Sequence, residues 1–97
     1  MNKYELAVVV SAKLEDEARA EVIEKVKAMI TRFGGNVTDV DEWGKRKLAY
    51  EINYEGEGYY VLYNFESKPD FPMELERIIN ITDGVLRSIV VLAQGQE

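Results

Sequence analysis

Apolar residues recur along this chain with two different periods, and the order of these periods predicts the order of its secondary structure elements. Residues 4–11 and 59–66 alternate between two faces at every second position, which is typical of β-strands. Residues 15–33 place apolar side chains at steps of three and four, as one face of an α-helix does. Residues 37–53 are β-like, residues from Pro69 onward begin a shorter helix, and residues 85–92 form a last strand.

This order, β-α-β-β-α-β, is that of the α+β ferredoxin-like fold. Right-handed crossovers in such a chain put both helices on the same face of a four-stranded antiparallel sheet. We expect one domain over residues 1–97, with turns at Gly34–Gly35, at residues 54–58 and at residues 82–84. Asp70 is the expected N-cap of the second helix, and Phe71 is expected on its apolar stripe.

The alternation in residues 37–53 changes phase part-way along the strand. Val37 and Val40 do not share the parity of Leu48, Tyr50 and Ile52, and Gly44 lies between the two halves. We therefore expect a bulge or bend near Gly44. The second half would then be held by Leu48, Tyr50 and Ile52 packing in the core, and the direction of Arg46 depends on the bend.

One face of the predicted sheet has no helix over it, yet its residues are partly apolar. Parity assigns Ala7, Val9, Ala49, Tyr60 and Leu62 to this face, and the last strand adds either Ile89 and Val91 or Val90 and Leu92. Contiguous exposed apolar area usually marks a binding surface, whereas scattered single residues are normal on any protein. The candidate partner-binding residues are Ala7, Val9, Tyr60, Leu62, Ile89 and Val91.

Composition excludes several kinds of chemistry. The 97 residues contain no cysteine and no histidine, which rules out disulfides, thiolate sites and His-dependent catalysis, so we predict no enzyme and no cofactor. Asp39, Asp41 and Glu42 are a possible cation site, but a solvated strand edge explains them better, and we predict no metal. Without a membrane-length apolar run or a signal peptide, we expect a cytoplasmic protein.

Lys45, Arg46 and Lys47 are three consecutive cations in a chain whose net charge is −6. Lysine and arginine neutralise phosphates, and arginine also binds two phosphate oxygens at once. Three such residues at a strand bend are suited to contact a nucleic-acid backbone. A solvated turn that offsets the nearby acidic residues explains the same pattern, and the spacing alone does not decide between the two interpretations.

The sequence resembles the family of bacterial small ribosomal subunit protein six over nearly its whole length. The strongest match is the segment Gly44–Asn53, which resembles the family's pattern of glycine, basic residues and Leu-Ala-Tyr. The opening Tyr4–Glu5, the segment Gly58–Tyr60 and the segment Asp83–Ser88 also resemble the family.

This resemblance implies the ferredoxin-like fold and a non-catalytic structural role. It implies binding to the central domain of small-subunit ribosomal RNA, as a heterodimer with the basic small-subunit protein eighteen. By matching position, Lys45, Arg46 and Lys47 would contact RNA, together with Arg87, Lys3 and Tyr4. No membrane and no small-molecule substrate is implied.

Two other functions fit the same fold. One is a non-catalytic interaction module that self-associates through the uncovered sheet face or an edge strand. The other is a small hydrolase or ligand-binding domain, since this fold hosts many functions. A hydrolase would need a phosphate-binding loop after the first strand, and the segment Ser11–Leu14 contains neither glycine nor arginine there.

Overall fold

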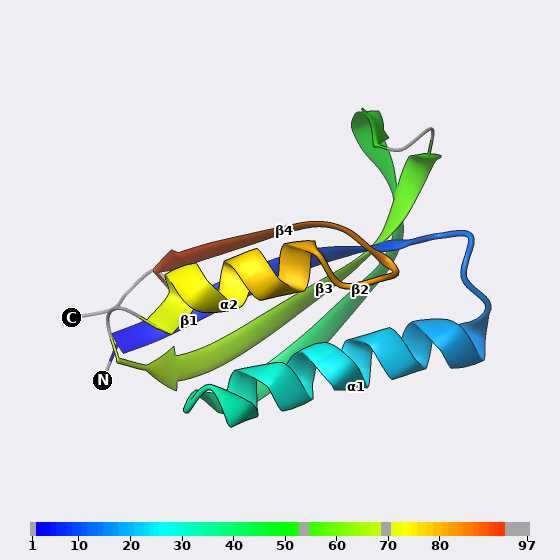
Figure 1. Ribbon diagram of the computed structural model, residues 1–97. Helices are drawn as coiled ribbons and strands as arrows, with labels where there is room; N and C mark the ends of the chain where they lie inside the picture. Colours follow the sequence, from blue (N-terminus) through cyan, green and yellow to red (C-terminus); the bar gives the residue numbers. More distant parts are fainter. Residues whose placement is uncertain (1, 53–54, 69–70, 93–97) are drawn as a thin grey trace.

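The computed structural model describes residues 2–52, 55–68 and 71–92. Their elements follow the predicted order β-α-β-β-α-β (Figure 1). The bounds are β1 Asn2–Ser11, α1 Asp16–Arg32, β2 Asn36–Ile52, β3 Glu55–Ser67, α2 Phe71–Asn80 and β4 Val85–Leu92.

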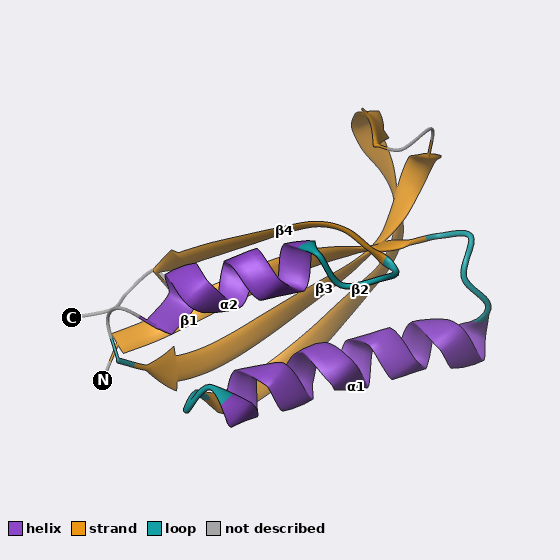
Figure 2. Cartoon of the chain, viewed as in Figure 1, coloured by secondary structure: helices purple, strands orange, loops and turns teal. Residues whose placement is uncertain are grey.

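The four strands form one sheet in the order β2-β3-β1-β4. Each pair of neighbours is antiparallel, and β1 and β3 pair along their whole common length, from Asn2 opposite Ser67 to Ser11 opposite Gly58. Both helices lie on the same side of this sheet (Figure 2). The predicted ferredoxin-like fold is therefore confirmed, and neither of the two helices in the described part of the chain lies over the other face of the sheet.

Local sequence explains where most elements begin and end. Asp16 and Glu17 lie in the first turn of α1, where the positive end of the helix dipole favours carboxylates. Gly34 follows α1 with a φ of 94°, and Gly84 precedes β4 with a φ of 91°, a backbone region that glycine adopts without steric cost.

The predicted turn over residues 54–58 is too long, because β3 already begins at Glu55. Asn53, Tyr54, the proposed cap Asp70, the Phe71 side chain and residues 93–97 lie outside the described residues.

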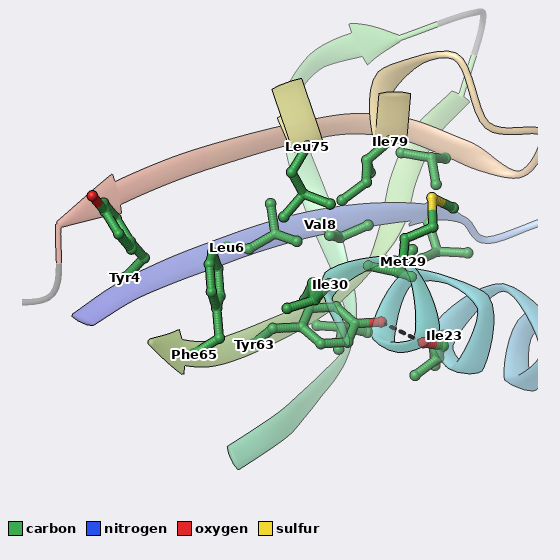
Figure 3. Packing of buried hydrophobic residues seen from close by; sticks show 14 residues of the cluster. Tyr4, Leu6, Val8, Ile23, Met29, Ile30, Tyr63, Phe65, Leu75 and Ile79 are labelled. Carbon is green, nitrogen blue, oxygen red and sulfur yellow. Dashed lines mark hydrogen bonds between the residues drawn. The ribbon is translucent and has the colours of Figure 1, made fainter. Parts of the chain in front are cut away.

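The core lies between the helices and one face of the sheet (Figure 3). Leu6 and Val8 of β1, Ile30 of α1, and Leu75 and Ile79 of α2 are fully buried there. Tyr4 stacks on Phe65 across the β1–β3 pair, with ring centroids 5.6 Å apart. Within this core Tyr63 buries its whole side chain, and its hydroxyl donates a hydrogen bond of 2.9 Å to the carbonyl oxygen of Ile23 in α1. This bond ties the centre of β3 to α1.

The predicted bulge near Gly44 is confirmed. The register between β2 and β3 shifts between Glu42 and Gly44, and Gly44 has a φ of 89°. Beyond this point the ends of β2 and β3 form a hairpin that projects past the rest of the domain (Figure 1). The extra residue reverses which side chains face the helices.

This reversal makes our prediction for the second half of β2 wrong. Leu48 is buried, but not in the main core. A Cβ built on Gly58 would meet both Val9 and Leu48, so Leu48 packs near Val9 on the helix-free side of the sheet. Tyr50 is 62% exposed, so it is not a core residue. Ala49, which we placed on the helix-free face, therefore points the other way.

We expect Tyr63→Phe to lower the free energy of unfolding by about 1 kcal/mol, because the Ile23 carbonyl loses a buried donor. Urea unfolding at pH 7 measures the difference. Tyr60→Phe is the matched control, since Tyr60 lies on the other face of the same strand and is partly exposed. Equal stability of the wild type and Tyr63→Phe would contradict this role.

We also expect stability to fall at alkaline pH. Burial is the main cause that raises the pKa of Tyr63 above its ordinary value of 10.0. The folded protein therefore holds a proton that the unfolded chain releases above pH about 10, so the stabilisation is complete below that pH and is lost as pH rises. Urea unfolding of wild type and Tyr63→Phe from pH 8 to 11 should show the stability difference shrinking above pH 10. Parallel curves would rule this contribution out.

Candidate nucleic-acid interface

The cations Lys45, Arg46 and Lys47 lie where β2 enters the projecting hairpin. All three are exposed, and they pair in register with Tyr59, Gly58 and Glu57 of β3. Because side chains alternate along a strand, Arg46 faces the helix-free side while Lys45 and Lys47 face the other. Among the described residues no ion pair joins any of the three to a carboxylate. Their charges are therefore available to a ligand on both sides of the hairpin.

Arg87 joins this group from a distant part of the chain. It lies on β4 opposite Val9, on the helix-free face, and its guanidinium donates a hydrogen bond of 2.7 Å to the Tyr50 hydroxyl. Tyr50 belongs to the hairpin, so the bond places Arg87 beside the three cations although 37 residues separate the two partners. Sequence reasoning had assigned Tyr50 to the core. Tyr50 shares the alternation of Leu48 and Ile52, which predicted a buried side chain, and nothing in that pattern indicated a bond to Arg87.

A network on the helix side supports the base of the hairpin. The Tyr59 hydroxyl donates a hydrogen bond of 2.9 Å to the Glu42 carboxylate, which spans the bulge. The Arg19 guanidinium of α1 lies over the Tyr59 ring, 4.1 Å from its centroid, and also pairs with Asp16 at 2.9 Å. The bond to Glu42 is the main cause that raises the pKa of Tyr59. Helix α1 therefore restrains the hairpin at the point where it leaves the sheet.

A small apolar contact supports the hairpin on its helix-free side. Gly58 is buried, and a Cβ there would collide with Cγ1 of Val9 and lie 3.5 Å from Cδ2 of Leu48. The missing side chain lets Val9 and Leu48 approach each other across β3. Leu48 thereby anchors the strand that carries the cations, although outside the main core where we had placed it.

The helix-free face carries all six candidate partner-binding residues. Ala7 pairs with Leu62 on one side and Ile89 on the other, while Val9 pairs with Tyr60, and Glu5 pairs with Val91. The last strand therefore presents Ile89 and Val91 on this face, 42% and 48% exposed, whereas Val90 packs against the core. Val9 is an exception, since it is buried and offers a partner little surface.

Lys3 and Tyr4 are not part of the cationic group. Lys3 is exposed and pairs with Glu66 at the far end of β1, eight residues from Ser11, or about 27 Å along the strand. Tyr4 is 7% exposed and its ring packs in the core. The structure thus gives Tyr4 a packing role, and its ring has too little free surface to stack on a base. Both residues lie away from the hairpin, and we remove Tyr4 from the candidate contacts.

The acidic residues of β2 lie before the bulge and show no sign of a metal centre. Glu42 is hydrogen-bonded by Tyr59, and Asp41 accepts a hydrogen bond of 2.9 Å from the Trp43 indole. Within the residues that the structure describes, no group of three acidic or other metal-ligating side chains is placed to hold an ion. None of the described helices is long and apolar enough to cross a membrane.

Comparison with known proteins identifies the family. The sequence model of the family described as "Ribosomal protein S6" matches residues 3–92. The chain belongs to the ribosomal protein S6 family. It is 53% identical over 91 residues to the small ribosomal subunit protein bS6 of Caldanaerobacter subterraneus subsp. tengcongensis, with 94% of this chain and 96% of that protein covered. The bS6 protein of Clostridium novyi is 52% identical over the same length and shares of both chains.

Solved structures agree with this assignment. The crystal structure of 30S ribosomal protein S6 from Thermotoga maritima superposes with a TM-score of 0.87 at 29% identity, over 95% of this chain and 87% of that one. The C-terminal domain of MgtC from Mycobacterium tuberculosis has a TM-score of 0.62 at 9% identity, which shows a shared fold alone. The chain is therefore a component of the small ribosomal subunit, located on the cytoplasmic ribosome, and not an enzyme.

We expect Gly58→Ala to displace the hairpin of this S6 family member. The added Cβ has no room beside Val9, so Val9 and Leu48 must move apart, which we expect to cost about 1–3 kcal/mol of folding stability. Urea unfolding measures the loss, and amide chemical shifts of Lys45–Leu48 report the displacement. Gly56→Ala is the control, because a Cβ at Gly56 meets nothing within 4 Å. Unchanged shifts in Gly58→Ala would refute the proposed close packing.

Proposed function

We propose that this chain binds the central domain of small-subunit ribosomal RNA, as a heterodimer with small ribosomal subunit protein eighteen. The RNA-contacting part is the projecting hairpin with Lys45, Arg46 and Lys47, extended by Arg87. The partner-docking part is the apolar centre of the helix-free face, around Leu62 and Ile89. The resemblance described above suggests both ligands, and the arrangement of these side chains supports them.

The observation that carries the RNA assignment is the position of the four cations. Three are exposed on a hairpin that extends beyond the body of the domain, and Arg87 is held beside them through Tyr50. A projecting element of this kind reaches a groove or backbone without a collision between the rest of the domain and the RNA. Arginine and lysine contacts of this type fix position on the backbone and do not read sequence.

The need for a partner follows from charge. A protein of net charge −6 is repelled by RNA as a whole, and four local cations supply limited counterion release. A basic partner attached to the helix-free face would offset the negative net charge, so that RNA no longer repels the pair of proteins as a whole. Complementary charge also speeds the association of the two proteins.

We expect measurable binding to a central-domain RNA fragment when protein eighteen is present, and at least about tenfold weaker binding without it, because the partner offsets the acidic charge. Filter binding across a salt series measures both cases. Sedimentation of the isolated chain is the control for self-association through Ile89 and Val91. Tight binding without the partner, or no binding in either case, would contradict the heterodimer.

We expect Lys45→Ala/Arg46→Ala/Lys47→Ala to weaken RNA binding by the heterodimer and to flatten its salt dependence. Each lost phosphate contact reduces the slope of log K against log salt by about 0.7–0.9, so three give a reduction of about 2–3. Affinity and slope are measured by the same salt series.

The matched control is Lys25→Ala/Lys27→Ala/Arg32→Ala, which removes the same charge types from exposed positions on α1. We expect this control to keep the wild-type slope. An equal loss in both variants would show a general charge effect, and no loss in either would remove the hairpin from the RNA interface.

A further inference from the structure

The two edge strands of the sheet differ in how they are protected from pairing with another strand. In the order β2-β3-β1-β4, the outer sides of β2 and β4 meet no further strand within the described part of the chain. An open edge presents backbone N–H and C=O groups to other chains, and charged side chains and bulges commonly prevent pairing there. β2 has both protections, since it carries charged residues on either side of its bulge at Gly44.

β4 has little of this protection. Its eight residues, Val85–Leu92, include one charged side chain, Arg87, and no proline. From Arg87 to Leu92 it pairs with β1 without a bulge, and Ile89, Val91 and Leu92 are exposed. High β-propensity, low charge and the lack of proline are typical of strands that associate edge to edge. The sequence of β4 therefore favours pairing with a further strand.

Asn80 covers the middle of this edge. It is the last residue of α2, which packs along β4 (Figure 1). Its side-chain oxygen accepts a hydrogen bond of 3.0 Å from the backbone N–H of Ser88 and another of 3.0 Å from the Ser88 hydroxyl. The N–H of Ser88 therefore points away from its β1 neighbour Val8 and toward the open edge. The Asn80 amide takes the place that a carbonyl oxygen of a neighbouring strand would have.

We propose that the outer edge of β4 fits a second copy of the same strand, and that the side chain of Asn80 keeps this edge closed. The inference does not depend on the proposed function, because it concerns the isolated chain. It assigns to Asn80 a role in keeping the protein monomeric, beyond the tether that it forms between α2 and β4.

The pattern of β4 suits a second copy arranged antiparallel about Ile89. In that register Ile89 lies opposite its own counterpart and Arg87 lies opposite Val91, so no like charges face each other. Each residue keeps its face of the sheet, because the register is even, and both helix layers stay on the same side. The two sheets then continue into each other.

The same register shows why Asn80 matters. Ser88 of one copy would lie opposite Val90 of the other, and the N–H and C=O groups of both residues point to the open side. This pair and its symmetric equivalent form the central hydrogen bonds of the interface. Half of these bonds need the Ser88 N–H as donor, and in this structure that donor is already bonded to Asn80. Pairing therefore requires the Asn80 contact to break.

The test is the self-association of the full chain, measured by sedimentation over a wide range of protein concentrations. We expect the wild type to sediment as a monomer. Asn80→Ala leaves the Ser88 N–H without an acceptor, so we expect self-association to become at least about tenfold tighter. Asn80→Asp keeps an oxygen acceptor for this N–H and should remain a monomer.

Three further variants separate edge pairing from a general loss of stability. Asn80→Ala/Ile89→Lys places a lysine opposite its own counterpart at the centre of the interface, so it should return to a monomer. Ser88→Ala removes the hydroxyl but keeps the backbone bond to Asn80, and it should also stay a monomer. Tyr63→Phe loses a buried hydrogen bond elsewhere and controls for lower stability.

Amide hydrogen exchange gives a second readout that needs no variant. In dilute wild-type protein the Ser88 amide should exchange more slowly than the Val90 amide, since Asn80 accepts a bond from the first alone on this edge. In Asn80→Ala, protection of the Val90 amide should rise with protein concentration as the edge becomes paired.

Several results would overturn the inference. A folded Asn80→Ala chain that stays monomeric at every concentration shows that Asn80 does not keep the edge closed. Self-association that persists in Asn80→Ala/Ile89→Lys shows that it does not involve β4, and a wild-type dimer paired through β4 shows that the edge is open. Equal exchange of the Ser88 and Val90 amides in the wild type removes the proposed cap, even if Asn80→Ala does not fold.

Discussion

The bulge at Gly44 is the constraint on which the candidate interface depends. One extra residue in β2, accommodated by a positive φ at a glycine, reverses the facing of the side chains that follow it, as the pairs from Gly44 to Lys47 show. It moves Leu48 to the helix-free side, where it packs near Val9, and it frees Tyr50 to reach Arg87. Without the bulge, Arg46 would point toward the helix layer, and the strand would continue along the sheet.

The hairpin is held on both sides of its base, and the two supports differ in character. On the helix side, the Tyr59–Glu42 hydrogen bond spans the bulge, and Arg19 covers the tyrosine ring. On the helix-free side, the contact is apolar and exists because Gly58 has no side chain. A polar and an apolar support together keep a projecting element in one direction, which lowers the entropy lost when it binds.

Charge is distributed unevenly between the two ends of the sheet. The chain as a whole is acidic, yet the exposed cations Lys45–Lys47 and Arg87 gather at the hairpin end of the sheet, with Arg46 and Arg87 on its helix-free face. Asp39 and Glu5 lie toward the other end of that face. Asn64 and Gly58 mark the two ends on β3 and are six residues apart, or about 20 Å, which exceeds the Debye length of about 10 Å at 0.1 M salt, so each end keeps its own local potential. This arrangement reconciles a net charge of −6 with a place in a ribonucleoprotein particle.

The sequence by itself determined the order of elements, the ferredoxin-like fold and the exposed cationic segment, because periodicity and turn residues act locally. It also located the bulge, since a change of phase beside a glycine is visible in the pattern. Tertiary structure alone decided which way the strand turned after Gly44, so Leu48, Tyr50 and Ala49 could not be assigned correctly in advance. Tertiary structure likewise decided that Ile89 and Val91, rather than Val90 and Leu92, face away from the helices, and it decided that Tyr4 is buried. Both outcomes depend on the register between strands that are far apart in the chain.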